Sequence, residues 1–416
     1  MIFPRKIEPE LIENLPNRRA LIILGARQTG KTTLLKRIQA QIQDEKTLYF
    51  DLEQQDSIRL FKEGVDSFIQ YLDDQGFSES ERVVVFIDEI QYLDEFSNFI
   101  KLAVDHYSHR LKLIVSGSSA AQIKYQFKDS LVGRKFIYKL HPLSFREFVI
   151  FKNESSISKH LGTHYQEADL ETLNRTFKKR IDALYHEFMI YGGYPEVVLA
   201  QSVSLKKNIL EEIIQTYVLK DIRNLFTIEK INAFNHLVRI LALQSGQLFN
   251  RENVGNEIKL NMRTLDRYIL ILADTYLIQP VKPLYSNKPK ELKKMPKIFL
   301  NDTGLRNSLM NNFNGFDHRA DGGELFESAI FSALWKNKGS LDELYFWRTT
   351  MGKEIDFVLQ MGAEYVPFEV KKTLRKKNYL ESFGKLYPCN TLNMVYLNES
   401  KIRIPDNINL IPAWAL

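Results

Sequence analysis

Continuous apolar runs mark the first third of the chain, whereas alternating apolar and polar residues mark its end. The apolar runs cover residues 21–24, 83–87 and 111–115, the last interrupted only by a lysine. Runs of this kind are typical of strands buried on both faces of a parallel sheet. We therefore expect an α/β fold in which this part of the chain forms a parallel sheet covered by helices.

A glycine-rich segment connects the first apolar run to a helical pattern. It comprises Gly25, Ala26, Arg27, Gln28, Thr29, Gly30, Lys31 and Thr32, and Thr33 follows it. This spacing fits the P-loop pattern G-x-x-x-x-G-K-[ST], whose backbone N–H groups surround a phosphate. We expect Lys31 to reach the β- and γ-phosphates of a nucleotide and the Thr32 hydroxyl to bind Mg²⁺. A chance match on a glycine turn is the alternative, and the flanking strand and helix patterns argue against it.

Two acids, Asp88 and Glu89, end the second apolar run. In open parallel sheets, ligands bind at the carboxyl ends of the strands, where these acids would lie. We expect Asp88 to hold Mg²⁺ through water and Glu89 to be the base for the water that attacks the γ-phosphate. A kinase can use a similar loop, but the adjacent pair of acids favours hydrolysis. A solvated charge at the strand end is the alternative for Glu89.

Two further positions are candidates for contact with the γ-phosphate. Ser119 belongs to the run of hydroxyls, 116–119, that follows the third strand, and Arg134 precedes another apolar stretch. A guanidinium group stabilises charge spread over phosphate oxygens, so Arg134 could act on the nucleotide of a neighbouring subunit. An ordinary surface arginine is the alternative that stays open.

Residues 20–145 resemble an AAA+ ATPase module. Residues 25–32 match its Walker A motif and residues 87–91 its Walker B motif. Ser119 stands where such proteins carry a sensor residue, usually Asn or Thr, and Arg134 stands where they carry the arginine finger. The resemblance implies binding and hydrolysis of ATP with Mg²⁺, and we expect a homo-oligomer.

Composition limits the remaining possibilities. The chain has 416 residues, 44% hydrophobic and 26% charged, which predicts a globular protein of about two to four domains. No apolar run approaches the roughly 20 residues of a membrane span, and the first residues lack a signal-peptide core. Cys389 is the only cysteine, which excludes disulfide frameworks and cysteine-rich zinc sites. We expect a cytoplasmic protein with no membrane contact.

Lysine is concentrated at two places in the second half of the chain. Residues 282–297 and 371–377 are both rich in basic side chains, although the net charge of the whole chain is only +6. A nucleic-acid backbone, most simply that of DNA, is a natural partner for such clusters. A solvated loop or helix face is the alternative.

The middle of the chain is helical in pattern. Residues 142–224 predict a helical lid or linker, with a sharp structural turn at residues 191–196. Residues 225–300 predict a winged helix-turn-helix, with helices near 228–243 and 251–258 and a third that begins at Met262. In such domains the start of the third helix reads the major groove. Those residues here would be Met262, Arg263, Asp266 and Arg267, although winged helices also serve as packing modules.

Residues 354–359 and 365–371 alternate apolar with polar side chains and predict a β-hairpin. A two-residue loop at 362–363 would place Asp356 directly opposite Glu369, with their Cβ atoms about 5 Å apart. Carboxylates in this position repel each other unless a cation lies between them, and closely spaced oxygens suit Mg²⁺. Lys371 falls on the same face as Glu369. Because Pro367 lacks a backbone donor, the register could slip.

These acidic positions resemble the PD-(D/E)XK nuclease superfamily. Asp356 matches the first acid, residues 369–371 match the E-x-K element, and Glu327 matches an auxiliary metal-binding acid on the first helix. The resemblance implies a restriction-endonuclease-like α/β domain over residues 301–416, with Asp356, Glu369 and Lys371 catalytic and Glu327, Asp356 and Glu369 binding metal. The alternative is a set of solvated salt bridges on an exposed sheet face.

The predicted organisation is an ATPase core (1–141), a helical lid (142–224), a winged helix (225–300) and a nuclease-like domain (301–416). This order resembles a widespread prokaryotic family of ATP-binding proteins whose role is poorly defined. Three functions fit it. The first is an AAA+ ATPase coupled to a DNA-binding, Mg²⁺-dependent nuclease; the second has the same ATPase with a catalytically silent binding module; the third is an ATP-gated switch. The filled acidic positions favour the first.

Overall fold

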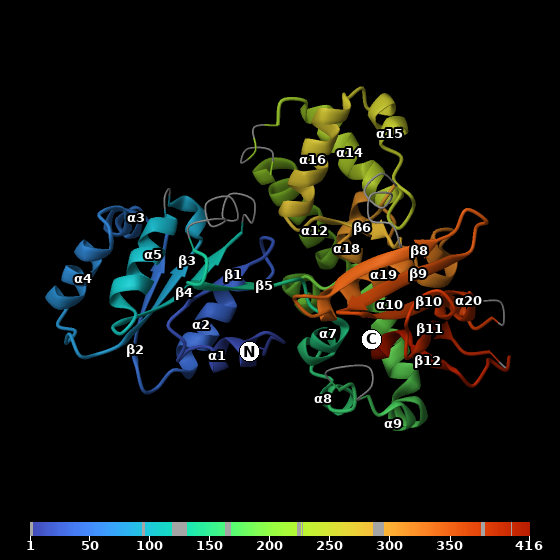
Figure 1. The fold of residues 1–416 in the computed structure, drawn as a ribbon, viewed down its shortest axis with the longest axis horizontal. Coiled ribbons are helices and arrows are strands. Elements are labelled where there is room, and N and C mark those ends of the chain that lie inside the picture. Colours follow the sequence, from blue (N-terminus) through green and yellow to red (C-terminus); the bar gives the residue numbers. More distant parts are fainter. Residues whose placement is uncertain are drawn as a thin grey trace. The chain divides into compact units, whose positions relative to one another are not determined.

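The computed structural model describes residues 3–93, 96–118, 131–162, 168–222, 226, 228–285, 295–375, 379–400 and 402–416. The chain divides into two compact units, whose elements are labelled in Figure 1. The first unit consists of Met1–His141 with Asp274–Tyr276, and the second of Pro142–Ala273 with Leu277–Leu416. Within the described part of the chain, no helix combines the length and the apolar character that crossing a membrane requires.

A five-stranded parallel sheet forms the centre of the first unit. Its strand order is β2 (Lys46–Asp51), β3 (Val83–Asp88), β4 (Leu111–Gly117), β1 (Ala20–Leu24) and β5 (Lys135–Lys139). β1, β3 and β4 are buried along their whole length, which confirms the parallel α/β sheet expected from the apolar runs. Because all the strands are parallel, the segments that follow β1 and β3 both lie at the carboxyl edge of the sheet.

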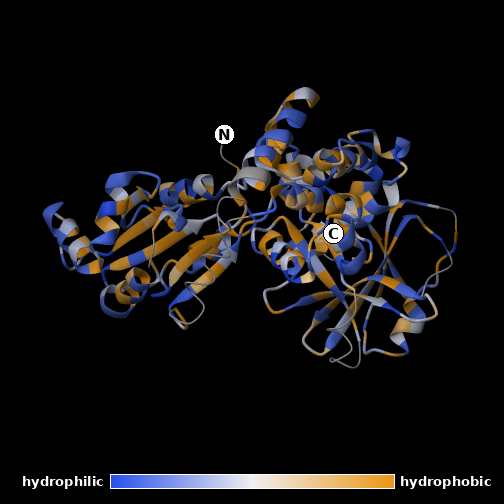
Figure 2. Ribbon diagram, turned by 90° about the horizontal axis from the view of Figure 1, so that it is seen from above, coloured by the Kyte–Doolittle hydropathy of each residue, from blue (hydrophilic) through white to orange (hydrophobic). Residues whose placement is uncertain are grey.

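Helices cover both faces of this sheet. They are α1 (Glu8–Glu13), α2 (Lys31–Gln41), α3 (Gln55–Lys62), α4 (Val65–Asp74), η1 (Ile90–Tyr92) and α5 (Phe96–Tyr107). On one face, β-strand side chains pack with those of α3, α4 and α5, including Phe61, Phe68 and Phe99. On the other face they pack with Leu11 of α1 and Leu35 of α2. The strands between these two layers are largely hydrophobic in Figure 2.

The second unit combines many short helices with a second sheet. Its helices are α7 (Phe145–Phe151), α8 (Ser155–Ser158), α9 (Leu170–Thr172), η3 (Leu173–Phe177), α10 (Lys178–Tyr191), α11 (Pro195–Leu199), α12 (Val203–Ile213), η4 (Ile214–Asp221), α14 (Ile231–Leu243), α15 (Arg251–Glu257), α16 (Met262–Asp274), α18 (Thr303–Leu309), η5 (Phe316–His318), α19 (Gly322–Asn337), α20 (Leu380–Gly384) and η6 (Ala413–Ala415). The helical character predicted for residues 142–224 is present from α7 to η4.

The second sheet has seven strands. In spatial order they are β12 (Ile408–Pro412), β11 (Leu392–Asn398), β10 (Glu364–Thr373), β9 (Glu354–Met361), β8 (Glu343–Arg348), β6 (Ile278–Pro283) and β7 (Lys297–Leu300). β9 and β10 form the hairpin expected from the alternating pattern, and Met361 pairs with Glu364 across the two-residue loop. Phe357 pairs with Phe368. The paired residues run from Met361 and Glu364 to Phe357 and Phe368, so Pro367 causes no slip along this length. The direct opposition of Asp356 and Glu369, one position beyond the last pair, stays a prediction.

The region predicted as a winged helix contains three helices, α14, α15 and α16, followed by the antiparallel pair β6–β7. Leu248, between α14 and α15, forms an antiparallel bridge to Lys297. β6 also pairs with β8, so the boundary expected at residue 300 falls inside the seven-stranded sheet. Arg263 and Arg267 are exposed at the start of α16. The winged helix and DNA contact by α16 both stay predictions.

The turn between α10 and α11 is structural. Gly192 has a φ of 74°, and a Cβ atom there would lie 2.1 Å from Oδ1 of Asp302. Oδ2 of Asp302 accepts the Gly193 N–H at 2.8 Å, and Oδ1 accepts the Leu305 N–H at 3.1 Å at the start of α18. One buried carboxylate therefore fixes the turn and caps the helix.

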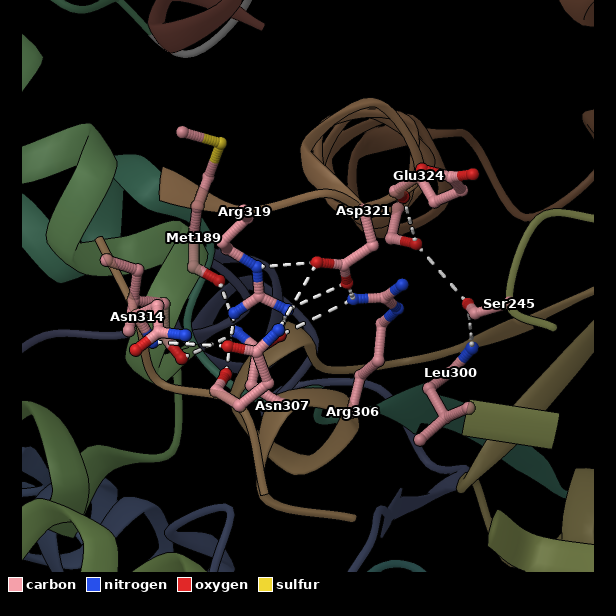
Figure 3. A network of polar contacts seen from close by, with 12 residues as sticks. Met189, Ser245, Leu300, Arg306, Asn307, Asn314, Arg319, Asp321 and Glu324 are labelled. Carbon is pink, nitrogen blue, oxygen red and sulfur yellow. Dashed lines mark hydrogen bonds and ion pairs between the residues drawn. The ribbon is translucent and has the colours of Figure 1, made fainter. Parts of the chain in front are cut away.

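A buried ionic network lies next to this turn (Figure 3). The carboxylate of Asp321 accepts hydrogen bonds from Arg306 and Arg319, each at 2.8 Å. Asn307 accepts from Arg319 at 2.9 Å and donates to the Met189 carbonyl at 3.1 Å. The network thereby ties α10, α18 and the segment before α19 together.

Candidate functional site

The glycine-rich segment forms a loop between β1 and α2. Gly30 has a φ of 92° and Gln28 a φ of 60°, a left-handed conformation that glycine adopts most readily. A Cβ atom on Gly25 would lie 2.3 Å from the Leu140 carbonyl oxygen, so the start of the loop also requires glycine. The Thr29 hydroxyl donates to the Ala26 carbonyl at 2.8 Å. The backbone of the predicted P-loop is therefore fixed by its own sequence.

Lys31 is the first residue of α2 and is only 4% exposed. Its ammonium group donates to the carbonyls of Gly25 and Ala26, at 3.2 and 3.0 Å. Burial lowers the pKa of Lys31, and the charges of Glu89 and Asp88 oppose this shift. The lysine thus points back into the loop, as expected for a side chain that meets phosphate there. Thr33, two residues further along α2, is exposed.

Asp88 is the centre of a hydroxyl cluster. Its Oδ2 accepts the Thr32 hydroxyl at 2.6 Å and the Tyr49 hydroxyl at 2.7 Å. Its Oδ1 accepts the hydroxyl of Ser116. Burial, followed by the hydrogen bond to Asp88, raises the pKa of Tyr49. The structure brings together Thr32 and Asp88, which the sequence assigned to the same Mg²⁺, but the sequence gives no local signal for Tyr49, which lies on the neighbouring strand β2.

Glu89 has a φ of 56° and a ψ of 50°, a left-handed conformation that is strained for a residue with a side chain. Gln91 donates a hydrogen bond from Nε2 to Oε2 of Glu89. Oε1 of Gln91 in turn accepts the Ser118 N–H at 3.1 Å. Gln91 therefore connects the predicted base to the end of β4. Ser119, the predicted sensor, lies outside the described residues.

Arg134 lies at the opposite edge of the sheet from the P-loop. The Ala20 N–H, at the start of β1, donates to the Arg134 carbonyl at 2.9 Å, whereas the P-loop follows the end of β1. The guanidinium pairs with Asp105 at 2.6 Å and stays partly exposed. This position separates Arg134 from the P-loop of its own chain by the length of a strand, so action on a neighbouring subunit stays a prediction.

Arg5 supports the P-loop and was not recognised in the sequence. It is 7% exposed and donates to the carbonyls of Thr29 and His141, both at 2.7 Å. A guanidinium group suits this role because its donors are fixed in one plane. Arg5 is far from Thr29 and His141 in the sequence, so no local motif could have indicated these contacts.

The acids predicted in the second unit gather at one end of the hairpin. Oδ2 of Asp356 accepts the Val370 N–H at 2.7 Å, and Lys371 pairs with Oε1 of Glu369 at 2.5 Å. Burial, then the charge of Asp356, raises the pKa of Glu369 to about 7, against the effect of Lys371. Burial also raises the pKa of Glu327 to about 7, where Lys297 lowers it and Asp356 raises it. These four predicted residues therefore interact electrostatically.

Lys297 enters the same cluster from β7 and was not assigned to it from the sequence. Its Nζ lies 2.8 Å from Oε1 of Glu327 and 2.8 Å from Oε1 of Glu354. Within the described ranges, no group of three or more His, Cys, Asp or Glu side chains is arranged to hold a metal ion. Carboxylate oxygens are ligands that Mg²⁺ accepts, but in this arrangement a lysine ammonium lies among them.

Comparison with known families matches the whole first sheet to an AAA-type model. Residues 17–149 match a family model described as "AAA domain". Residues 182–315 and 322–416 match two models, each described as a domain of unknown function. Together with the P-loop geometry, the first match defines residues 17–149 as an AAA-like P-loop ATPase domain. None of these three models is described as a nuclease, so the nuclease-like domain stays a prediction.

Relatives with a similar length exist in distant organisms. An uncharacterized protein of Haemophilus influenzae is 26% identical over 404 residues, covering 94% of this chain and 92% of the relative. A second, of Methanocaldococcus jannaschii, is 24% identical and covers 99% of this chain and 90% of the relative. The similarity thus extends across both units.

Solved structures are less similar. The Walker-type ATPase PABY2304 of Pyrococcus abyssi is 14% identical, with a TM-score of 0.47 over 74% of this chain and 96% of that one. The replication initiator DnaA bound to AMPPCP and single-stranded DNA is 15% identical, with a TM-score of 0.30 over 65% of this chain and 86% of that one. Because both scores are below 0.5, the assignment rests on the family model and the geometry of the loop.

Proposed function

We propose that the first unit binds ATP together with Mg²⁺ and hydrolyses its γ-phosphate bond. The observation that carries this proposal is the 2.6 Å contact between the Thr32 hydroxyl and Asp88, beside the buried ammonium of Lys31. A P-loop hydroxyl and a strand-end carboxylate that meet at one point are the groups that hold Mg²⁺ in P-loop ATPases.

Each residue has a distinct role in this proposal. Lys31 exchanges its present carbonyl acceptors for phosphate oxygens. Thr32 and Asp88 would hold Mg²⁺, which would supply positive charge to the phosphates. Tyr49 and Ser116 orient the Asp88 carboxylate. Glu89 accepts a proton from the attacking water once its side chain is released from Gln91.

Binding of a fluorescent ATP analogue to the full chain tests the nucleotide site. Lys31→Ala should abolish binding, because the β- and γ-phosphates lose their buried cation. Lys36→Ala, on an outward position of the same helix, is the matched control and should bind normally. Equal affinity in the Lys31→Ala chain and the wild type would remove the P-loop as the site.

Assembly forms a separate part of the proposal. If Arg134 acts on the nucleotide of a neighbouring subunit, turnover per chain should increase with protein concentration. Arg134→Ala should then lose hydrolysis and keep nucleotide affinity, whereas Asp105→Asn should keep both because it removes only the partner of the arginine. Turnover that is independent of concentration in a monomeric protein would contradict this role.

A second candidate function belongs to the second unit. The contacts of Asp356 with the Val370 N–H and of Lys371 with Glu369 support a Mg²⁺-dependent nuclease centre, and the exposed arginines of α16 support DNA binding. A catalytically silent binding module is the alternative. Plasmid and single-stranded DNA, each with and without ATP and Mg²⁺, should be cleaved by the wild type and left intact by Lys371→Ala. The silent module would leave both substrates intact in every reaction.

A further inference from the structure

The carboxylate–lysine cluster, formed by Glu327, Glu354, Asp356, Glu369, Lys297 and Lys371, is an unusual place for a lysine. Lys297 is 5% exposed, and its ammonium reaches Glu327 on α19 and Glu354 on β9 at the same distance of 2.8 Å. An ammonium group buried this deeply keeps its charge only when carboxylates compensate for its lost hydration. Here two carboxylates from different elements do so.

The position of the ammonium is that of a bridging cation. Glu327 and Glu354 come from separate elements, and Asp356 also acts on Lys297 electrostatically. The geometry alone therefore places one ammonium group between carboxylates of two different elements.

The cluster also retains one unsatisfied oxygen. Glu369 is 4% exposed, and its Oε2 has no hydrogen-bond partner within the part of the chain that is described. A buried carboxylate oxygen without a donor is costly, and a cation is the ligand that would stabilise it. The four carboxylates of this cluster face the ammonium groups of Lys297 and Lys371 and, 3.6 Å from Glu354, the guanidinium of Arg348, so one formal negative charge remains and favours an additional cation.

We propose that Lys297 occupies the position of a divalent cation in this cluster, so that Mg²⁺ or Mn²⁺ binds tightly to Glu327, Asp356 and Glu369 only when this ammonium is withdrawn. The inference rests on the proposed metal centre and adds to it an internal competitor. Lys297 lies in β7, which pairs with β6, so its ammonium enters the cluster from a strand outside the β9–β10 hairpin.

Mn²⁺ binding to the nucleotide-free full chain tests this inference, with free Mn²⁺ measured by electron paramagnetic resonance. Lys297→Met removes the charge and keeps the aliphatic stem, whereas Lys297→Arg keeps the charge and is the matched control. Lys297→Met should bind one more Mn²⁺ per chain than the wild type, at least about tenfold more tightly, which corresponds to about 1.4 kcal/mol. Lys297→Arg should bind as the wild type does.

Two further variants cover the case in which Lys297→Met does not fold and check that the ion binds at Asp356. If Lys297→Met fails to fold, the double variant Lys297→Met with Glu354→Gln removes one charge of each sign and should still gain the ion. Adding Asp356→Asn to Lys297→Met should remove it again.

The two ways of failing are distinguishable. If the wild type and Lys297→Met bind Mn²⁺ equally tightly and Asp356→Asn loses it, the metal centre stands and the competition by Lys297 is wrong. If none of these chains binds Mn²⁺ above the level of Asp356→Asn, the metal centre and the inference both fall.

Discussion

Buried carboxylates at the two candidate sites are compensated in opposite ways. Asp88 in the first unit is held by three neutral hydroxyl groups, those of Thr32, Tyr49 and Ser116. The acids of the carboxylate–lysine cluster are held by ammonium groups. Hydroxyl donors leave the negative charge of an acid in place, whereas an ammonium group cancels it. Two sites that both contain suitable metal ligands can therefore differ in their readiness to bind metal.

Asp321 is a third carboxylate, and its negative charge is compensated by two arginines. Its partners Arg306 and Arg319 have buried side chains. Asp321→Asn should lower the free energy of unfolding by about 3–5 kcal/mol, because it leaves two buried charges without their counter-ion. Chemical denaturation monitors this loss in the full chain, and Asp317→Asn, at a neighbouring exposed acid, should change stability little. A loss below 1 kcal/mol for Asp321→Asn would contradict a structural role.

Because of these two arginines, we expect the free energy of unfolding to depend on pH in the acidic range. Burial opposes ionisation of Asp321, but the hydrogen bonds and charges of Arg319 and Arg306 outweigh it and lower the pKa to about 2. The folded pKa is thus below that of the unfolded chain, near 4. The stability that this provides is present above about pH 4 and is lost as the pH falls toward 2. Asp321→Asn should lack this part of the acid sensitivity when denaturation is repeated across that range.

Asp88→Asn should reduce ATP hydrolysis, whereas the corresponding change in the second unit should not. The amide keeps the shape of the side chain but removes the charge that holds Mg²⁺, so hydrolysis of ATP should fall about 10–100-fold. Nucleotide binding should persist, because Lys31 and the loop are unchanged. Asp356→Asn is the corresponding change in the second unit and should leave phosphate release at the wild-type rate. A parallel loss of hydrolysis in both variants would erase the distinction between the sites.

Tyr49→Phe should have a smaller effect. It removes one of the three hydroxyl donors to Asp88 while Thr32 and Ser116 remain, so turnover should fall about threefold to tenfold. Tyr107→Phe, which loses a 2.7 Å contact with the exposed Asp66, is the matched control and should be unaffected. Unchanged turnover in Tyr49→Phe would mean that the tyrosine does not orient Asp88.

Gln91→Ala should produce the smallest change, and it acts on Glu89 alone. Without Gln91 the Glu89 side chain loses one hydrogen bond, so turnover should change by less than about fivefold. An increase indicates that Gln91 restrains the base, whereas a decrease indicates that Gln91 positions it. A loss as large as that of Asp88→Asn would instead place Gln91 in the metal site itself.

Local spacing carried most of the correct expectations. The P-loop, the acids after β3 and the β9–β10 hairpin each lie within a short stretch of sequence, where strand, turn and helix patterns encode the geometry directly. The two-residue loop and the alternation of a strand gave the register of this hairpin as far as the pair of Phe357 and Phe368, and the opposition of Asp356 and Glu369 beyond it stays a prediction. The sequence also predicted the parallel α/β sheet of the first unit, because its strands are buried on both faces.

Contacts between distant segments were not predictable in this way. Tyr49 meets Asp88 because β2 lies beside β3, and Arg5 reaches Thr29 and His141 only through the fold. Lys297 belongs to a lysine-rich stretch that the sequence predicts to be a basic surface, although β7 buries this lysine among acids. In each case the signal depends on which strands become neighbours, and a single sequence does not specify that.

Hydrolysis of ATP by the Glu89→Gln chain, measured as phosphate release at saturating ATP and Mg²⁺, tests the central claim most directly. Glutamine cannot accept the proton of the attacking water, while Lys31, Thr32 and Asp88 still hold the nucleotide and its metal. We predict that Glu89→Gln binds ATP as the wild type does and hydrolyses it at least about 100-fold more slowly, while Glu369→Gln hydrolyses it normally. Wild-type turnover in Glu89→Gln would contradict the proposed site of hydrolysis.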